Sequence, residues 1–252
     1  MELSTFFQEH EHIALAFSGG VDSAYLLYVA TQCHADVCAY YVKSAFQPQF
    51  ELDDAQQLAR QLGVDLQIIS VDILSASTVI SNPPDRCYHC KKVIFSQIAE
   101  HAMADGRTVL IDGTNASDDV TDRPGMKALT ELSVLSPLRT CGLTKDKIRQ
   151  LSKEAGLFTW NKPAYACLAT RIPSGSPITS DKLSKTEHAE NYLSSLGFSD
   201  FRVRLYGNAA RLQITEAQTA LLMKHRTAII DELKHDYDAI LLDLEVRNES
   251  IS

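Results

Sequence analysis

Ser18-Gly19-Gly20-Val21-Asp22-Ser23 is the stretch that decides the fold. It follows an apolar run at residues 13–17 and opens an apolar-patterned stretch at residues 24–30, so it predicts a strand, a glycine turn and the start of a helix. Two adjacent glycines let the backbone approach an anion closely, and a helix N-terminus attracts negative charge. The stretch therefore predicts a phosphate-binding loop; the alternative is a plain glycine turn.

The side chains of this loop favour the phosphate interpretation. The predicted phosphate ligands are Ser18, Gly19, Gly20 and Ser23. Asp22 carries a carboxylate that can hold Mg²⁺ against phosphate oxygens, so we expect it to be catalytic. The pattern SGGxDS resembles the loop of the PP-loop ATP pyrophosphatases, and this resemblance implies cleavage of ATP between its α- and β-phosphates. The stretch lacks the GK[ST] ending of a Walker A motif and the GxGxxG spacing of dinucleotide folds.

Strand-like and helix-like segments alternate through the first two thirds of the chain. The predicted strands are residues 13–17, 36–42, 65–71 and 108–111, and the predicted helices are residues 24–31, 51–62 and 88–104. This alternation predicts an α/β fold with a doubly wound parallel sheet, whose ligands bind beyond the carboxyl ends of the strands. The PP-loop resemblance implies the adenine nucleotide alpha hydrolase-like version of that fold.

The turn-rich segment at residues 172–177 predicts a domain boundary. We expect a PP-loop ATP pyrophosphatase domain at residues 1–172 and a small α+β domain at residues 173–252 for substrate binding or oligomerisation. A chain of 252 residues is long enough for both. A helix at 144–155 precedes the boundary; helices at 179–196 and 217–233 and strands at 201–205, 211–215 and 239–244 follow it.

Composition excludes some classes of protein. No apolar stretch approaches the roughly 20 residues of a membrane span, and the first twelve residues lack the features of a signal peptide. We therefore expect a cytoplasmic protein without a membrane partner. The formal charge of −8 argues against a large nucleic-acid surface, because phosphate binding needs clustered Lys and Arg.

Grouped cysteines give the second chemical signal. Cys87 and Cys90 stand three positions apart at a predicted helix entrance, where thiolates are favoured, and Cys167 lies in an irregular segment. Three cysteines suit a [4Fe–4S] cluster with one open iron. The alternatives are a zinc site that adds His89, a redox dithiol, and unrelated buried thiols. The remaining cysteines, Cys33, Cys38 and Cys141, are expected to pack as small core residues.

A longer set of motifs resembles the LarE family, the ATP-dependent sulfur transferases of nickel-pincer nucleotide biosynthesis. The match spans most of the chain: SGGVDS at 18–23, NPPDRCYHCK at 82–91, DGTNASDD at 112–119, RPG at 123–125, SPL at 136–138, GLTK at 142–145, WNKP at 160–163, CLATRIP at 167–173 and FRVR at 201–204. Each motif alone is common. Their order and spacing together indicate the family.

The resemblance implies a reaction in two stages. ATP adenylates a carboxylate of a nucleotide substrate, pyridinium-3,5-biscarboxylic acid mononucleotide, and sulfur then replaces AMP. In one branch of the family the cysteine at the position of Cys167 gives up its own sulfur. In another, cysteines matching Cys87, Cys90 and Cys167 bind a [4Fe–4S] cluster that delivers sulfide. Since this chain has all three, we expect the cluster-dependent mode, with ATP and Mg²⁺ as the other cofactors.

The resemblance also implies roles for other residues. The loop residues expected to border the adenylate are Gly113, Thr114, Asn115, Asp118 and Arg123. The arginines expected to bind the substrate phosphate are Arg171, Arg202 and Arg204, because Arg makes bidentate contacts to phosphate. Glu190 and Asp243 are expected on a surface helix and at a strand end; the alternative is that they join a metal or substrate site. The implied partners are the other proteins of nickel-pincer synthesis and further copies of the chain, as a hexamer.

Other functions stay open at this point. A PP-loop tRNA thiolase can also combine the loop with three cluster cysteines, but such relatives usually show SGGKDS where this chain has Val21. A PP-loop amidotransferase or synthetase leaves the grouped cysteines unexplained. A nucleotide-binding regulator stapled by zinc keeps the loop but releases no pyrophosphate.

Overall fold

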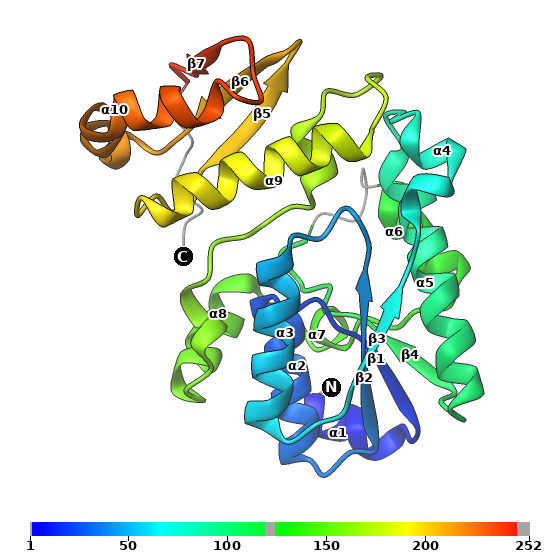
Figure 1. Ribbon diagram of the computed structural model, residues 1–252. Helices are drawn as coiled ribbons and strands as arrows, with labels where there is room; N and C mark the ends of the chain where they lie inside the picture. The colour runs from blue at the N-terminus through cyan, green and yellow to red at the C-terminus, as the bar shows by residue number, and fades with distance from the viewer. Residues whose placement is uncertain (1, 119–123, 246–252) are drawn as a thin grey trace. The chain divides into compact units, whose positions relative to one another are not determined.

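The computed structural model describes residues 2–118 and 124–245 (Figure 1). By its internal contacts the chain divides into one unit at residues 1–79 and 85–162 and another at residues 80–84 and 163–252. The division after Lys162 precedes the boundary expected between residues 172 and 173. Residues 163–172 belong to the second unit because their side chains and carbonyls hydrogen-bond to its helix and strands.

The first unit is built on a parallel sheet with the strand order β3-β2-β1-β4. Its strands are β1 (Ile13–Ala16), β2 (Val37–Lys43), β3 (Leu66–Ser70) and β4 (Val109–Ile111), each within a residue or two of its predicted bounds. Because β2 and β3 extend the sheet on one side of β1 and β4 pairs on the other, the strand order reverses beside β1. Ligands bind at such a reversal, beyond the carboxyl ends of the strands.

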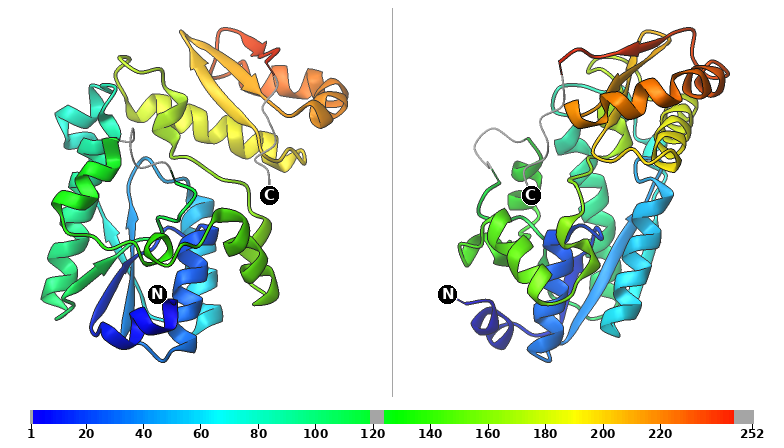
Figure 2. Two further views of the ribbon diagram at one scale, coloured as in Figure 1. Left: turned by 180° about the vertical axis from the view of Figure 1, so that it is seen from behind. Right: turned by 90° about the vertical axis from the view of Figure 1, so that its left-hand side faces the viewer.

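Helices cover both faces of this sheet, as Figure 1 and Figure 2 show. They are α1 (Leu3–Glu9), α2 (Val21–Gln32), α3 (Gln49–Leu62), α4 (Ser77–Ile80), α5 (Arg86–Ala104), α6 (Pro124–Glu131), α7 (Pro137–Thr140) and α8 (Lys145–Glu154), with single 3₁₀ turns η1 (Ile73–Ser75) and η2 (Phe158–Asn161). The alternation of side chains along β1 separates two cores: Ile13 and Leu15 pack with α2, whereas Ala14 packs with Ile98 of α5. The predicted α/β fold is thereby confirmed.

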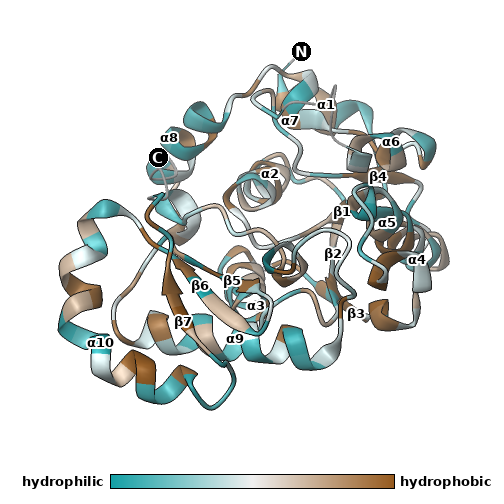
Figure 3. Cartoon of the chain, turned by 90° about the horizontal axis from the view of Figure 1, so that it is seen from above, coloured by the Kyte–Doolittle hydropathy of each residue, from teal (hydrophilic) through white to brown (hydrophobic). Residues whose placement is uncertain are grey.

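The second unit has a small sheet of its own, in the order β5-β6-β7. β5 and β6 are antiparallel, and β6 and β7 are parallel. The elements are η3 (Leu168–Arg171), α9 (Ser180–Ser195), β5 (Arg202–Tyr206), β6 (Ala209–Gln213), η4 (Glu216–Gln218), α10 (Thr219–Leu233) and β7 (Ile240–Leu242). β7 is hydrophobic along its length (Figure 3). The expectation of an α+β fold for this part of the chain matches these elements.

Within the described residues, no helix is long and apolar enough to cross a membrane. Of the three cysteines expected in the core, Cys38 is buried in β2, and burial raises the pKa of its thiol. Cys33 and Cys141 are half-buried and pack against the core around α2.

Candidate active site

The glycine loop follows β1 and leads directly into α2, as the sequence predicts. Gly19 has a φ of +71°, and a Cβ atom built on it would lie 3.2 Å from the backbone nitrogen of Ala55 in α3. A side chain at this position would therefore be strained by its φ and would also crowd α3. Gly20 has an ordinary φ of −78° and forms the N-cap of α2.

Two serine hydroxyls fasten the loop to the first turn of α2. The hydroxyl oxygens of Ser18 and Ser23 are 3.1 Å apart, and the Ser23 hydroxyl donates to the carbonyl of Gly20 at 3.2 Å. The backbone N–H of Ser18 donates to Ser23 Oγ at 3.3 Å. These bonds hold the loop in one shape, while phosphate binding by its residues stays a prediction.

Asp22, in the first turn of α2, joins three segments that are distant in the sequence. Its Oδ2 atom lies 2.5 Å from Nζ of Lys145 in the first turn of α8, and its Oδ1 accepts from the Asn115 side-chain amide at 3.2 Å. The side chains of Asp22 and Lys145 are 21% and 28% exposed, so both retain contact with solvent. A carboxylate is thus presented at the helix N-terminus beside the glycine loop.

The loop that follows β4 lies against the glycine loop, because β4 is the neighbour of β1. A Cβ atom on Gly113 would come within 3.0 Å of the Ser23 nitrogen, so the close approach requires glycine. The Asp118 carboxylate accepts from the Asn115 N–H at 3.0 Å, and Thr114 donates its hydroxyl to Asp112 at 2.5 Å. The structure therefore brings the predicted loop residues together beside the glycine loop; Arg123 lies outside the described residues.

Two cations at this site could not be identified from the sequence. Lys145 stands within the GLTK motif, and Arg139 stands in none of the motifs. The Arg139 guanidinium donates to the carbonyl of Asp118 at 2.8 Å, and the Lys145 N–H donates to Ser117 Oγ at 3.0 Å. Each therefore supports the loop after β4, and only the fold reveals this, because both belong to later segments of the chain.

The donor set fits Mg²⁺. This ion is typically held by one or two carboxylates together with substrate phosphates, and it keeps several waters. Asp22 supplies a partly exposed carboxylate at the loop, already paired with a positive charge on Lys145. The Asp22 side chain is therefore chemically suited to the ion.

Cys87 and Cys90 lie in the first turns of α5, and Cys167 precedes η3 in the other unit. Cys87 is exposed and Cys90 half-buried; Nη2 of the neighbouring Arg86 lies 3.8 Å from the Cys87 Sγ. Three thiols form a donor set suited to an iron–sulfur cluster, although no group of three metal-binding side chains is gathered within residues 2–118 and 124–245. His89 pairs with Asp85 at 3.3 Å.

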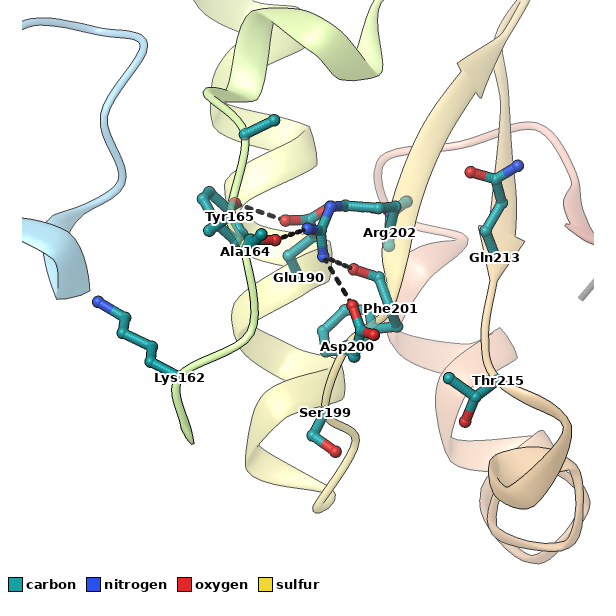
Figure 4. Close-up of polar contacts among 12 residues, drawn as sticks. Lys162, Ala164, Tyr165, Glu190, Ser199, Asp200, Phe201, Arg202, Gln213 and Thr215 are labelled. Atoms are coloured by element: carbon teal, nitrogen blue, oxygen red, sulfur yellow. Dashed lines mark hydrogen bonds and ion pairs between the residues drawn. The ribbon is translucent and has the colours of Figure 1, made fainter. Parts of the chain in front are cut away.

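In the second unit, Glu190 lies in a buried polar cluster, and Figure 4 shows its contact with Tyr165. Its carboxylate accepts from Nε and Nη2 of Arg171 at 2.7 and 3.1 Å, from the Tyr165 hydroxyl at 2.5 Å and from the Val203 N–H at 2.9 Å. The expectation that Glu190 occupies a surface helix position was wrong: its residue is 5% exposed. The buried partner Arg171 stabilises the carboxylate there.

Arg171 uses four of its five N–H donors in this arrangement. Besides its bonds to Glu190, it donates through Nη1 to the carbonyl of Ala166 at 3.0 Å and to the Thr170 hydroxyl at 2.7 Å. Burial is the largest single effect and opposes its charge, but the hydrogen bonds to Glu190 and the nearby negative charges together raise its pKa above the usual value. Its contact with a substrate phosphate stays a prediction.

Arg202 and Arg204 also donate to neighbouring groups. Arg202 is buried and donates to the carbonyls of Phe201 and Ala164, and its guanidinium lies over the Tyr165 ring (Figure 4). Arg204 is half-buried and donates to Gln213 at 2.5 Å and to the Thr170 carbonyl at 2.7 Å. Asp243 follows β7, as expected, and accepts from Gln213 at 2.8 Å. Phosphate binding by Arg202 and Arg204 stays a prediction.

A parallel α/β sheet with a glycine-rich loop and an aspartate at the strand reversal defines a nucleotide-binding protein of the PP-loop class. Residues 12–109 match the family model described as "Queuosine biosynthesis protein QueC". The chain is 35% identical over 210 residues to the pyridinium-3,5-bisthiocarboxylic acid mononucleotide synthase of Lactiplantibacillus plantarum, covering 82% of this chain and 76% of the relative. The chain belongs to this LarE family and is a sulfur-transferring enzyme of the PP-loop superfamily.

The chain is also similar to two further proteins. An uncharacterized protein of Synechocystis is 36% identical over 218 residues, which cover 86% of this chain and 81% of the relative. A tRNA-specific 2-thiouridylase of Thermotoga is 25% identical over 206 residues, which cover 65% of this chain and 57% of the relative.

Proposed function

We propose that this enzyme uses ATP to adenylate a carboxylate of pyridinium-3,5-biscarboxylic acid mononucleotide and then replaces AMP with sulfur, giving a thiocarboxylate. The observation that carries the proposal is Asp22 at the glycine loop, bonded to Asn115 of the next loop and to Lys145. This constellation suits a nucleotide triphosphate and its metal ion. The product name of the Lactiplantibacillus relative supports the substrate.

The first stage activates a poor electrophile. An oxygen of the substrate carboxylate attacks the α-phosphorus of ATP, the bond from that phosphorus to the bridging oxygen breaks, and pyrophosphate leaves with the electron pair. The N–H groups at the start of α2 and the hydroxyls of Ser18 and Ser23 orient the triphosphate. Asp22 would hold Mg²⁺, which would neutralise phosphate charge when bound.

The second stage exchanges AMP for sulfur. A sulfide nucleophile attacks the carbonyl carbon of the acyl-adenylate, and AMP leaves with the electrons of the bond that joined it. Cys87, Cys90 and Cys167 would hold a [4Fe–4S] cluster, which supplies this sulfide when bound. If the enzyme instead used Cys167 as its own sulfur donor, each molecule would act once and that residue would become dehydroalanine.

Elemental analysis separates these modes. Protein purified anaerobically should contain about four irons and matching acid-labile sulfide per chain, the content of one such cluster. Replacing Cys87, Cys90 or Cys167 singly by Ala should abolish the iron content and repeated turnover, whereas the matched control Cys33→Ala should leave both unchanged. Stoichiometric zinc in place of iron would refute sulfide delivery by a cluster. So would the loss of one H₂S per chain, if Cys167→Ala were the only one of the three substitutions to abolish turnover.

Pyrophosphate release tests the first stage separately. Release from ATP should depend on the dicarboxylate mononucleotide and should persist in Cys167→Ala, because adenylation precedes sulfur transfer. Release that depends on unmodified tRNA, and not on the mononucleotide, would instead favour a tRNA thiolase. This alternative draws on the 25% identity to a tRNA-specific 2-thiouridylase and is disfavoured by the net charge of −8.

We also propose that the working form is a homo-oligomer, a hexamer by family resemblance, and that its product passes to other proteins of nickel-pincer synthesis. Sedimentation of the full chain tests the first statement, and a monomer at micromolar concentration would refute it. Co-purification with those proteins tests the second.

A further inference from the structure

Lys145 is one of two cations at the nucleotide site, with Arg139, that the family resemblance leaves without a role, and it is the one that pairs with Asp22. Its ammonium lies 2.5 Å from the Asp22 carboxylate, and its own backbone N–H is fixed to Ser117 Oγ at 3.0 Å. The hydrogen bond of its backbone N–H fixes the position of the Lys145 backbone. The Lys145 side chain is 28% exposed. Lys145 is therefore held at the site without being sealed into it.

We propose that Lys145 is a phosphate-binding residue for ATP, which Asp22 holds in place until the nucleotide arrives. The inference rests on the proposed function, because it assigns the residue to the same triphosphate. On binding, Asp22 turns its charge to Mg²⁺, and the ammonium of Lys145 passes to an oxygen of the β- or γ-phosphate.

The exchange costs little because the pair is partly hydrated. Ion pairs in contact with solvent contribute at most modestly to stability, so their partners can be replaced by stronger ones. The triphosphate brings several negative charges to the loop, and the compact charge of a lysine on a flexible stem suits a phosphate oxygen. The same ion that takes up the Asp22 carboxylate also repels the ammonium from it.

The position of Lys145 suits the leaving group. Asp22 stands in the first turn of α2, so an ammonium bonded to it lies within one side-chain length of the N–H groups that attract phosphate. When the bond to the α-phosphorus breaks, negative charge grows on the departing pyrophosphate. The Lys145 ammonium offsets that charge as a hydrogen-bond donor, and no proton needs to be transferred.

The contrasting interpretation makes the pair a structural link that only holds α8 against α2. Binding assays without Mg²⁺ separate the two, because they remove the metal role of Asp22. The probes are ATP, pyrophosphate and AMP, added to the full-length protein in calorimetric titrations. The variants are Asp22→Asn, Asp22→Asn with Lys145→Ala, and Asp22→Asn with Lys145→Arg.

In the Asp22→Asn background the ion pair with Lys145 is already absent, so any further effect of replacing Lys145 does not come from losing that pair. We expect Lys145→Ala in that background to weaken ATP and pyrophosphate binding by about 10- to 100-fold, the range for a charged hydrogen bond, and to leave AMP binding unchanged. Lys145→Arg should restore most of the loss. The matched control is Lys147→Ala, since Lys147 is exposed on the same helix and its Nζ lies 3.2 Å from Gln150 Oε1; it should bind all three probes normally.

Equal binding of ATP and pyrophosphate with and without Lys145 in that background would overturn the inference. Equal weakening for all three probes would also overturn it, because that result indicates a general disturbance of the site. Failure of the wild-type protein to bind ATP even with Mg²⁺ present would instead refute the proposed function. The two failures are therefore distinguishable in one set of titrations.

Discussion

Asp22 with Lys145 in the first unit and Glu190 with Arg171 in the second use the same chemistry in different surroundings. Their closest N···O distances, 2.5 and 2.7 Å, are similar. The side chains of the first pair are 21% and 28% exposed, whereas Glu190 and Arg171 are 6% and 0% exposed. Glu190 also accepts from Tyr165 and Val203.

The difference in exposure separates a pair that can exchange a partner for a ligand from a pair that holds two segments together. A hydrated pair is worth little and can give up a partner to a ligand, but a buried pair is costly to break, since either charge left alone lacks water. Glu190 ties α9 to both ends of the segment from Tyr165 to Arg171, within which Cys167 lies. We therefore expect substitutions in the Asp22–Lys145 pair to lower activity. Substitutions in the Glu190–Arg171 pair should lower the free energy of unfolding.

The largest effect should come from Glu190→Gln. The substitution keeps the shape but leaves the Arg171 guanidinium buried without a countercharge, so we expect the free energy of unfolding to fall by about 3–5 kcal/mol. Urea unfolding followed by circular dichroism measures the loss. A fall below about 1 kcal/mol would show that this pair behaves like a hydrated one.

Asp22→Asn should lower activity strongly and stability only slightly. Because the pair with Lys145 is partly exposed, the free energy of unfolding should change by no more than about 1 kcal/mol. Substrate-dependent pyrophosphate release should nevertheless fall by about 100-fold or more, the scale at which a group that stabilises developing charge acts. Pyrophosphate release at the wild-type rate would contradict the role of Asp22. A loss of stability as large as that of Glu190→Gln would show that the two pairs do not differ in their contribution to stability.

Tyr165→Phe tests the buried cluster more gently. Phenylalanine keeps the ring, which lies 4.6 Å from the Arg171 guanidinium carbon and 5.1 Å from that of Arg202. It removes only the hydroxyl that donates to Glu190, so we expect unfolding to become easier by about 1.5–3 kcal/mol, the usual range for a hydrogen bond to a charged group. A cost equal to that of Glu190→Gln would mean that the hydroxyl, and not the ion pair, dominates.

Tyr237 extends the comparison to pH, because it is another buried polar residue of the second unit. Burial raises the pKa of Tyr237 to about 12, above the value near 10 of an unfolded chain. The neutral form is therefore favoured in the folded protein. Its contribution is complete below about pH 10 and is lost as the pH rises towards 12; at about pH 11 the loss is about 1 kcal/mol.

The measurement is the free energy of unfolding from about pH 9 to about pH 11 for the wild type and for Tyr237→Phe. The variant should lose about 1 kcal/mol less than the wild type over this interval. Parallel curves would mean that Tyr237 is not held neutral by the fold.

The smallest effect belongs to an exposed pair. Lys185 and Asp181 lie one turn apart on α9, with Nζ and Oδ2 3.0 Å apart. Lys185→Ala should leave the midpoint of thermal unfolding unchanged within error, because solvent screens the pair. A clear drop in that midpoint would indicate that the exposure of an ion pair does not by itself determine its contribution to stability.

Most of the fold could be predicted from local pattern. The strands of the first unit lie within short apolar runs bounded by polar residues, and Thr144 caps α8 by accepting from the Lys147 N–H as expected. Helix α1 was not predicted, because it is only seven residues long and its buried side chains are Leu3, Phe6 and Phe7. So short a pattern is weak evidence for a helix.

The parts of the site that depend on distant partners could not be predicted. The burial of Glu190 follows from Arg171 and Val203, and nothing in the polar sequence of α9 indicates it. The pairing of Lys145 with Asp22 joins residues 123 positions apart. By contrast, the approach of Gly113 to Ser23 follows from strand order, because loops after neighbouring parallel strands meet at one edge of the sheet.

Gly19 lies so close to Ala55 that the two positions act as one steric constraint. Ala55 is completely buried in α3, and a larger residue there would displace the glycine loop as surely as a side chain at position 19 would. Variation at the two sites is therefore coupled: a variant library that diversifies α3 while leaving the loop intact would still lose nucleotide binding unless position 55 stays small. α3 thus constrains the position of the glycine loop, and with it the position of any phosphate that the loop binds.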